Sequence, residues 1–287
     1  MKENTQNEYE KAVNRVIDYI NQHLYSSPNI KELSDIANMS EFHFHRVFKA
    51  VVGENVGEYI NRIRLEHIAQ RLHISKSGLQ EIAERTGYGT KHALSKAFKK
   101  HFGVSPSVYR RAPKNMEPFF KEREQRRSIV PQIKETGEKR LVYIRIVDWY
   151  GAPESYTRAW NELGKFAKRN NLIETGTEFI GLSFDDPTIT PPEKCRFYAC
   201  FTTSKDVKPT GPFGIQYTQP GLYAVFLHEG SYYELIDTYF YIYTNWLPNN
   251  TDYRSTGSMS FEKYLNSPDN TEEKDLMTEI YIPVKHI

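Results

Sequence analysis

Hydrophobic residues recur at helical spacing through the first hundred residues of the chain. Between residues 8 and 25 the apolar positions lie three or four apart, and Pro28 follows the last of them. This spacing predicts an amphipathic helix that ends before the proline. Its predicted inward stripe is Val13, Val16, Ile17, Ile20 and Leu24.

A pattern of short helix, turn and second helix follows, and it occurs twice, 49–50 residues apart. The first copy places Leu33, Ile36 and Ala37, then Phe44, Val47 and Phe48, on buried faces. The second copy places Leu79, Ile82 and Ala83, then Leu94, Ala97 and Phe98, in the same way. Asn29 with Glu32, and Ser77 with Gln80, predict a capping box before each copy; Ser40 and Thr90 are the expected N-caps of the second helices. The pattern is typical of two helix-turn-helix units.

One continuous helix is predicted between the two copies, from Gly57 to Leu72. A helix of about 16–18 residues is roughly 25 Å long. It can hold two recognition helices about one DNA turn (~34 Å) apart, where adjacent major-groove segments face the same side. We therefore expect one copy of the chain to be sufficient to bind an asymmetric site in double-stranded DNA.

The charge distribution agrees with this expectation. Residues 1–114 hold 18 Lys/Arg and 12 Asp/Glu, whereas residues 115–287 hold 20 and 24. From Arg85 to Lys114 there are eight basic residues and no acidic one. Such a run can be an ordinary solvated face, but on a helix-turn-helix repeat it indicates contact with phosphates.

Residues 8–112 resemble the AraC/XylS family of bacterial transcription factors. The similarity rests on Ser40–Lys49, on Tyr59–Leu65 and on the stretch from Gly87-Tyr88 through Phe98 to Arg110. It implies base reading by Phe42, His45 and Arg46 in one groove segment and by His92, Ser95 and Lys96 in the next, with His43 and Lys91 near the DNA backbone. Lys96 stands where the family usually has Arg, and Val56 where Pro is commoner. Two alternatives stay open: Phe42 as a buried residue, and Arg46 as a phosphate contact.

The second half of the chain predicts a different fold. Three prolines, Pro113, Pro118 and Pro131, bracket a charged stretch that reads as a connection, so we expect domains at 1–112 and 132–287 joined by a linker at 113–131. Beyond it, strands are predicted at 141–149, 179–184, 196–202, 221–229, 258–264 and 276–284, with helices at 153–168 and after Gly230. Two βαββ units of this kind predict an α+β domain, an antiparallel sheet with both helices on one side and an open concave face.

This half resembles the GyrI-like ligand-binding domain, through His228–Tyr232, Phe261–Leu265 and Thr278–Pro283. The resemblance implies a small-molecule effector and a functional glutamate at Glu279. Strand alternation places Glu279 and Tyr281 opposite Ile280 and Ile282, so a face turned away from the helices would carry both. An unpaired carboxylate among aromatic rings favours a cationic amphiphile. The alternative is a carboxylate held by a local tyrosine or lysine.

Aromatic residues are concentrated in this half, which holds all three Trp and 14 of the 20 Tyr. They indicate either an aromatic-lined cavity or an aromatic-rich core. The further candidates for contact with the effector are Trp149, Tyr150 and Tyr233.

Together these patterns predict a cytoplasmic, effector-responsive transcription factor, and we expect it to act as an activator. No Ser-His-Asp order, metal-ligand spacing or phosphate loop is present, so we expect no enzyme activity, metal or cofactor. We expect the two thiols, Cys195 and Cys200, to be reduced, because the sequence shows no export signal. It also shows no apolar run long enough to span a membrane, so we expect the protein to act in the cytoplasm. Two alternatives remain: a GyrI-like hydrolase, and a constitutive DNA binder whose second domain docks on a protein such as RNA polymerase.

Overall fold

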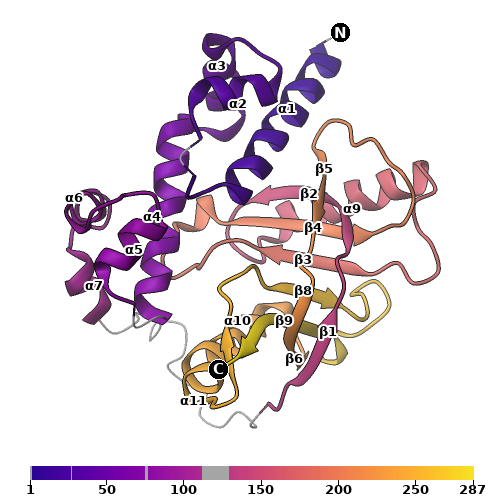
Figure 1. The fold of residues 1–287 in the computed structure, drawn as a ribbon. Coiled ribbons are helices and arrows are strands. Elements are labelled where there is room, and N and C mark those ends of the chain that lie inside the picture. The colour runs from indigo at the N-terminus through magenta and orange to yellow at the C-terminus, as the bar shows by residue number, and fades with distance from the viewer. Residues whose placement is uncertain (1, 27, 75–76, 112–128) are drawn as a thin grey trace. The chain divides into compact units, whose positions relative to one another are not determined.

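The computed structural model describes residues 2–26, 28–74, 77–111 and 129–287. It divides into two compact units, one built mainly from residues 1–117 and the other mainly from 118–287 (Figure 1). Most of the predicted linker, 113–131, lies outside the described residues.

The first unit is helical in the described residues. Its helices are α1 (Lys2–Gln22), α2 (Ile30–Ala37), α3 (Glu41–Val52), α4 (Val56–Ile74), α5 (Leu79–Arg85), α6 (Lys91–Phe102) and α7 (Pro106–Arg111). The pairs α2–α3 and α5–α6 are the two helix-turn-helix units. The linker helix α4 has 19 residues and is therefore about 28 Å long.

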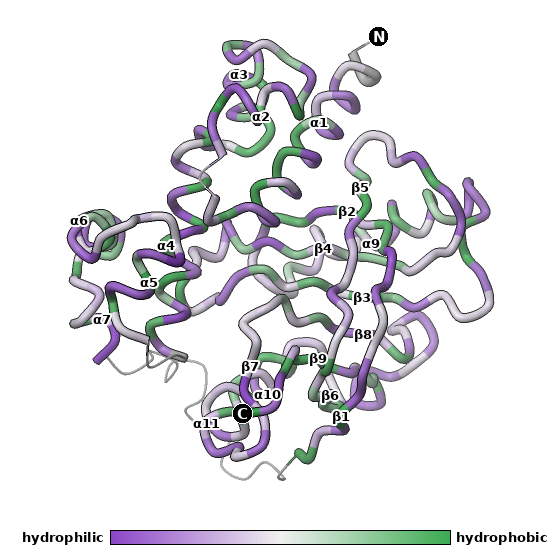
Figure 2. The backbone as a smooth tube through the Cα atoms, viewed as in Figure 1, coloured by the Kyte–Doolittle hydropathy of each residue, from purple (hydrophilic) through white to green (hydrophobic). Residues whose placement is uncertain are grey.

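Two hydrophobic cores share the linker helix. Tyr59 and Ile63, in the first half of α4, pack in a core with α1, α2 and α3. Leu65, Ile68 and Leu72, in its second half, pack with α5 and α6. Figure 2 shows the hydrophobic positions recurring along α1 and α4. Because one rigid helix belongs to both cores, the two helix-turn-helix units are held at a fixed spacing.

The predicted caps agree with the structure except at one position. Asn29 accepts a hydrogen bond from the backbone N–H of Glu32 (2.9 Å), and Ser40 and Thr90 cap α3 and α6. The predicted Ser77–Gln80 box does not form, since the N-cap of α5 is Gly78. The Gln80 side chain instead accepts from the backbone N–H of Lys91 (3.1 Å), and so joins the two helices of the second unit.

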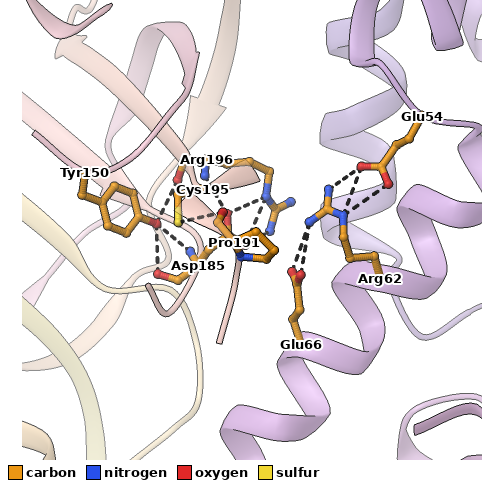
Figure 3. A network of polar contacts seen from close by, with 8 residues as sticks. All are labelled: Glu54, Arg62, Glu66, Tyr150, Asp185, Pro191, Cys195 and Arg196. Carbon is orange, nitrogen blue, oxygen red and sulfur yellow. Dashed lines mark hydrogen bonds and ion pairs between the residues drawn. The ribbon is translucent and has the colours of Figure 1, made fainter. Parts of the chain in front are cut away.

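A buried ion-pair cluster holds the start of α4. Arg62 is 7% exposed and donates to Glu54 (2.6 Å) and to Glu66 (3.1 Å), as Figure 3 shows. Glu54 lies in the turn between α3 and α4, so the cluster fixes the angle at which the linker helix leaves the first unit.

The second unit is an antiparallel sheet with helices. Its strands are β1 (Gln132–Thr136), β2 (Arg140–Val147), β3 (Phe179–Ser183), β4 (Arg196–Thr202), β5 (Phe213–Tyr217), β6 (Gly221–Glu229), β7 (Tyr253–Ser255), β8 (Phe261–Tyr264) and β9 (Met277–His286). Its helices are α9 (Pro153–Arg169), α10 (Leu235–Tyr241) and α11 (Leu247–Asn249), with a π-helical turn at Ile242–Trp246 and 3₁₀ turns at Pro192–Lys194, Tyr232–Glu234 and Glu273–Asp275. The strands β1, β5 and β7 were not predicted from the sequence.

The strand order is β1-β6-β9-β8-β3-β4-β2-β5, with β7 beside β9. The two predicted βαββ units are therefore the two halves of one sheet, and they meet where β8 pairs with β3. Ile280 and Ile282 of β9 pack with Leu235 and Ile242 from the second helical segment, as the alternation in this strand predicts.

The opposite face of the sheet is filled rather than open. Tyr143, Tyr198 and Tyr223 belong to a core on this face and are at most 1% exposed. The Tyr223 hydroxyl donates to the carbonyl of Gln219 (2.7 Å). The Lys139 N–H donates to the Thr218 hydroxyl (2.9 Å) and the Thr218 N–H donates to the Lys139 carbonyl (3.0 Å), which joins the segments that follow β1 and β5, the two edge strands. The predicted open concave face is therefore wrong, because large aromatic side chains occupy it.

Candidate functional site

The first recognition helix, α3, carries its predicted side chains at the surface. Phe42 is 74% exposed, and His45 and Arg46 are exposed as well. The Arg46 guanidinium lies over the Phe42 ring, 5.9 Å from its centroid. The alternative that Phe42 is buried is therefore wrong: Phe44, Val47 and Phe48 fill the core instead.

His43 lies at the edge of this surface. Its ring is half-buried and meets Tyr9 of α1 edge-on, with the ring centroids 5.4 Å apart. Its backbone N–H is bound by the N-cap Ser40. The position at the helix N-terminus suits an anionic group, because the unpaired N–H groups of the first turn concentrate positive charge there.

The second recognition helix, α6, is more basic. Lys91, His92 and Lys96 are exposed, and Ser95 is half-buried. The last turn of α6 adds Lys99 and Lys100, and the first turn of α6 contains no acidic residue. The two recognition helices thus differ in chemistry: the first offers an aromatic ring with an arginine, and the second offers lysines.

Glu279, the predicted effector-binding glutamate, is paired with lysines. It accepts from Lys134 Nζ (2.9 Å) and from the Tyr281 hydroxyl (2.8 Å), and Lys263 Nζ lies 3.9 Å away. Burial alone would raise the pKa of Glu279, but the bonds from Lys134 and Tyr281 outweigh it and lower the pKa. The expectation of an unpaired carboxylate at this position is therefore wrong, and the alternative of a locally held one is what the structure has.

Two of the tyrosines predicted to contact the effector, Tyr281 and Tyr150, pack against or hydrogen-bond to the rest of the domain. Tyr281 is 5% exposed and stacks on Phe261 with ring centroids 4.3 Å apart. The Tyr150 hydroxyl lies within 3.1 Å of the carbonyl oxygens of Asp185 and Arg196 and accepts from the Asp185 N–H. It braces the loop of the buried Arg196–Asp185 ion pair (2.5 Å), which Figure 3 shows.

The other two predicted aromatic residues are exposed and lie near each other. Trp149 is 45% and Tyr233 is 57% exposed. Both border Gly151: a Cβ atom placed on this glycine would lie 3.2 Å from Tyr233 Cε1 and 3.9 Å from Trp149 Cζ3.

A different glutamate, Glu262, has the properties expected of an effector site. It lies on β8, in register with Gly181 of β3, at the seam between the two halves of the sheet. Its side chain is 5% exposed. Three hydroxyls reach its carboxylate: those of Tyr264 (2.6 Å), Tyr239 (3.0 Å) and Ser183 (3.3 Å).

Aromatic rings surround this carboxylate. Tyr264 meets Tyr232 (centroids 5.3 Å apart) and Trp160 (5.7 Å) edge-on, and Tyr156 lies against Phe197 (4.9 Å). We call this set of residues the Glu262 cage: Tyr156, Trp160, Phe197, Tyr232, Tyr239, Glu262 and Tyr264. Both halves of the sheet contribute to it, since α9 supplies Tyr156 and Trp160.

The electrostatics of the cage set Glu262 apart from Glu279. Within the described residues no lysine, arginine or histidine forms an ion pair with Glu262. Burial raises the pKa of Glu262, and the three hydroxyl donors offset this only in part. Burial and the nearby carboxylate together raise the pKa of Tyr239 and Tyr264, and they raise that of Tyr232 to about 12. The carboxylate of the cage therefore has no countercharge among the residues that the structure describes.

A glycine makes room for this arrangement. A Cβ atom on Gly181 would overlap the Tyr264 hydroxyl and would lie 2.6 Å from Phe197 Cζ. Real Cβ atoms do not approach other atoms so closely, so only glycine at this position of β3 leaves room for the Tyr264 hydroxyl beside Glu262.

Alternation in the sequence could have identified Glu262. In Phe261-Glu262-Lys263-Tyr264, the glutamate and the tyrosine two residues later point to one face of the strand. The phenylalanine side joins the filled face, which leaves Glu262 facing the helices. Strand alternation and the resemblance to the GyrI-like domain favoured Glu279 instead.

The described residues contain no group of three or more His, Cys, Asp and Glu side chains placed to hold a metal ion. No helix among them has both the length and the apolar character that crossing a membrane requires.

Comparison with known proteins matches both units. Residues 130–285, more than half of the chain, match the GyrI-like small molecule binding domain, and residues 33–112 match a helix-turn-helix domain. The chain is 32% identical over 99 residues to the multiple antibiotic resistance protein MarA of Escherichia coli (strain K12), covering 34% of this chain and 78% of MarA.

Other relatives match parts of the chain. The HTH-type transcriptional regulator YbfP of Bacillus subtilis (strain 168) is 33% identical over 102 residues, 36% of this chain and 35% of YbfP, so the chain spans about a third of that relative. The crystal structure of the EcmrR C-terminal domain is similar with a TM-score of 0.47 and 22% identity, covering 55% of this chain and 99% of that one. The chain therefore belongs to the GyrI-like small-molecule-binding family and, through its AraC-type helix-turn-helix domain, is a DNA-binding transcriptional regulator rather than an enzyme.

Proposed function

We propose that the protein is a sequence-specific, cytoplasmic activator of transcription whose GyrI-like domain binds an organic cation carrying aromatic or lipophilic groups. The observation that carries the effector class is the Glu262 carboxylate, buried among tyrosines and without a cationic partner in the described residues.

A buried carboxylate is costly to ionise unless a positive charge joins it. The Glu262 cage provides hydroxyls for the carboxylate and ring faces for a cation, and aromatic faces attract quaternary or delocalised cations. An inorganic cation would keep its water shell and could not use the rings. A lipophilic organic cation gains both the charge pair and the apolar contact.

For DNA binding, we propose that Phe42, His45 and Arg46 read bases in one major-groove segment and that His92, Ser95 and Lys96 read bases in the next. His43 and Lys91 then lie near phosphates. Exposure of the recognition helices and the shared helix α4 support this assignment. One chain carries both readers, so a monomer is sufficient.

The DNA part is tested by fluorescence anisotropy on a duplex selected from a random pool. We expect a stoichiometry of one chain per site and a steep loss of affinity with salt, because lysine and arginine contacts release counterions. Binding only as two chains per site, or no binding at low salt, contradicts the proposal.

The effector part is tested by calorimetry with two ions of nearly the same shape. Tetraphenylphosphonium should bind the full-length protein, whereas tetraphenylborate should bind at least ~100-fold more weakly, since its charge repels the carboxylate. Equal affinities would mean that shape alone is recognised and would contradict the proposed cation site.

Activation requires contact with RNA polymerase, which we propose as the protein partner. Transcription in vitro from a template that carries the selected site should rise when the protein and tetraphenylphosphonium are added together. A rise that is the same without the cation would support a constitutive DNA binder instead. A fall would make the protein a repressor.

A further inference from the structure

Two exposed aromatic side chains lie on equivalent connections of the two βαββ halves. Trp149 follows β2 and precedes α9, and Tyr233 follows β6 and precedes α10. Each connection contains a glycine with positive φ, Gly151 (+88°) and Gly230 (+123°), which turns the chain from the strand toward the helix. The equivalence brings one ring from each half to the same place.

Both rings border the bare Cα of Gly151. A Cβ atom there would be within 4 Å of both rings and only 3.2 Å from Tyr233. The absence of this atom leaves the two rings near one another with their faces and edges in solvent, since Trp149 is 45% and Tyr233 is 57% exposed.

Hydrogen bonds hold the two connections in place. Asp148 accepts from the backbone N–H of Trp149 (2.8 Å) and from the hydroxyl of Ser155 at the start of α9 (2.7 Å). Ser231 accepts from the N–H of Tyr233 (3.2 Å), and its carbonyl lies 3.0 Å from His228 Nε2. The rings are therefore presented on fixed turns, which lowers the entropy lost when a ligand binds.

Each exposed ring is also close in the chain to a ring of the Glu262 cage. Tyr233 is next to Tyr232, whose ring meets Tyr264. Gly151 lies five residues before Tyr156, which is near enough to Glu262 for the carboxylate to raise its pKa, after the larger effect of burial. Tyr232 thus shares a connection with Tyr233, and Tyr156 lies in the first turn of the helix that follows the connection of Trp149.

We infer that Trp149 and Tyr233 form an outer subsite that binds a flat aryl group of the effector while the positive charge of the effector occupies the Glu262 cage. This inference rests on the proposed function and narrows it. The effector is an elongated cation whose aryl ring is separated from its charged centre by a short linker, rather than a compact cation. The carboxylates of Asp148 and Glu234, on the same turns, favour a positively charged ligand near the two rings.

The test compares two ligands by calorimetry on the full-length protein: (3-phenylpropyl)trimethylammonium and propyltrimethylammonium. The ratio of their affinities measures the contribution of the aryl group alone. For the native protein we expect a ratio of about tenfold or more, since a phenyl ring leaves water. In the Trp149→Ala/Tyr233→Ala double variant the ratio should fall below about threefold, while the affinity for propyltrimethylammonium should change little.

Two further variants separate the possible outcomes. Tyr217→Ala removes an exposed tyrosine (41%) from β5 and should keep the native ratio. Glu262→Gln should weaken both ligands together and leave the ratio unchanged. If the double variant keeps the native ratio of the two affinities, the proposal of an outer subsite is overturned. Unchanged affinity for both ligands in Glu262→Gln overturns the cation site instead, so the two failures are distinguishable.

Discussion

Glu262 and Gly181 face each other across the central strand pair of the sheet, one from each βαββ half. The glutamate supplies the charge, and the glycine supplies the space that lets the Tyr264 hydroxyl reach it. Neither half holds a complete site, because Tyr239 and Tyr264 come from the second half and Ser183 and Tyr156 from the first.

Substitution of Gly181 therefore tests the packing of the cage. We expect Gly181→Ala to weaken tetraphenylphosphonium binding at least ~10-fold and to lower the melting temperature, since overpacking a filled site costs ~1–3 kcal/mol. Calorimetry and thermal denaturation measure the two effects. Gly164→Ala is the matched control, because a Cβ there in α9 meets nothing within 4 Å. Native affinity in Gly181→Ala would show that Tyr264 is not held against Glu262.

Cation affinity should depend on pH. Burial raises the pKa of Glu262, so the carboxyl group is protonated over part of the range above the ordinary pKa of a glutamate. The affinity for tetraphenylphosphonium should rise as pH passes upward through this raised pKa, because only the ionised form pairs with the cation. Glu262→Gln should give a flat profile. If the affinity of the native protein is equally independent of pH, the carboxylate that pairs with the cation is not Glu262.

The stability of the ligand-free protein should change with pH in the opposite sense. A carboxyl group whose pKa is raised on folding binds more protons in the folded state than in the unfolded state. Its contribution to stability is therefore complete below the unfolded pKa and is lost as pH rises through the folded pKa. The free energies of unfolding of the native protein and of Glu262→Gln, measured by urea denaturation, should diverge in this pH range. The stability of the variant should depend less on pH. Parallel curves would contradict the raised pKa.

The buried Arg62 cluster predicts a large effect on the DNA-binding unit. Arg62→Met removes the buried ion pairs with Glu54 and Glu66 and should destabilise the unit by roughly 3–5 kcal/mol. Arg85→Met removes an exposed pair with Glu81 and should change stability by no more than ~0.5 kcal/mol. Denaturation followed by circular dichroism measures both. Similar losses in the two variants would mean that burial of Arg62 has no special effect.

Arg46 should contribute to base choice. Arg46→Ala should cost ~1–3 kcal/mol on the selected site and should relax the preference at one base position. Lys165→Ala, an exposed substitution in α9, should leave affinity unchanged. If Arg46→Ala weakens selected and random duplexes equally, Arg46 contacts a phosphate, and the assignment of base reading is overturned.

Periodicity in the sequence predicted the helical unit closely. The predicted stripes of α1 and α3 are buried, as are Leu94 and Phe98 of α6, whereas Ala97 is partly buried; a 3.6-residue repeat leaves one choice of inner face. The exception is Ser77, where Gly78 takes the cap and Gln80 bridges to Lys91. A local pattern cannot show that a side chain has a better partner eleven residues away.

The site in the second unit was harder to predict. Strand alternation placed Glu279 and Ile280 on the correct faces, yet it did not show that Lys134, 145 residues away in the chain, neutralises Glu279. Short strands such as β1 and β7 carry few apolar residues and were missed. Glu262 is a candidate binding residue because hydroxyl groups from both halves of the sheet surround it, and only the tertiary fold brings these groups together.

The central claim is most directly tested by calorimetric titration of tetraphenylphosphonium into three proteins: native, Glu262→Gln and Glu279→Gln. We predict that Glu262→Gln loses at least ~10-fold in affinity, while Glu279→Gln binds as the native protein does and differs only in stability. Loss of affinity in Glu279→Gln, together with native binding in Glu262→Gln, would contradict the account.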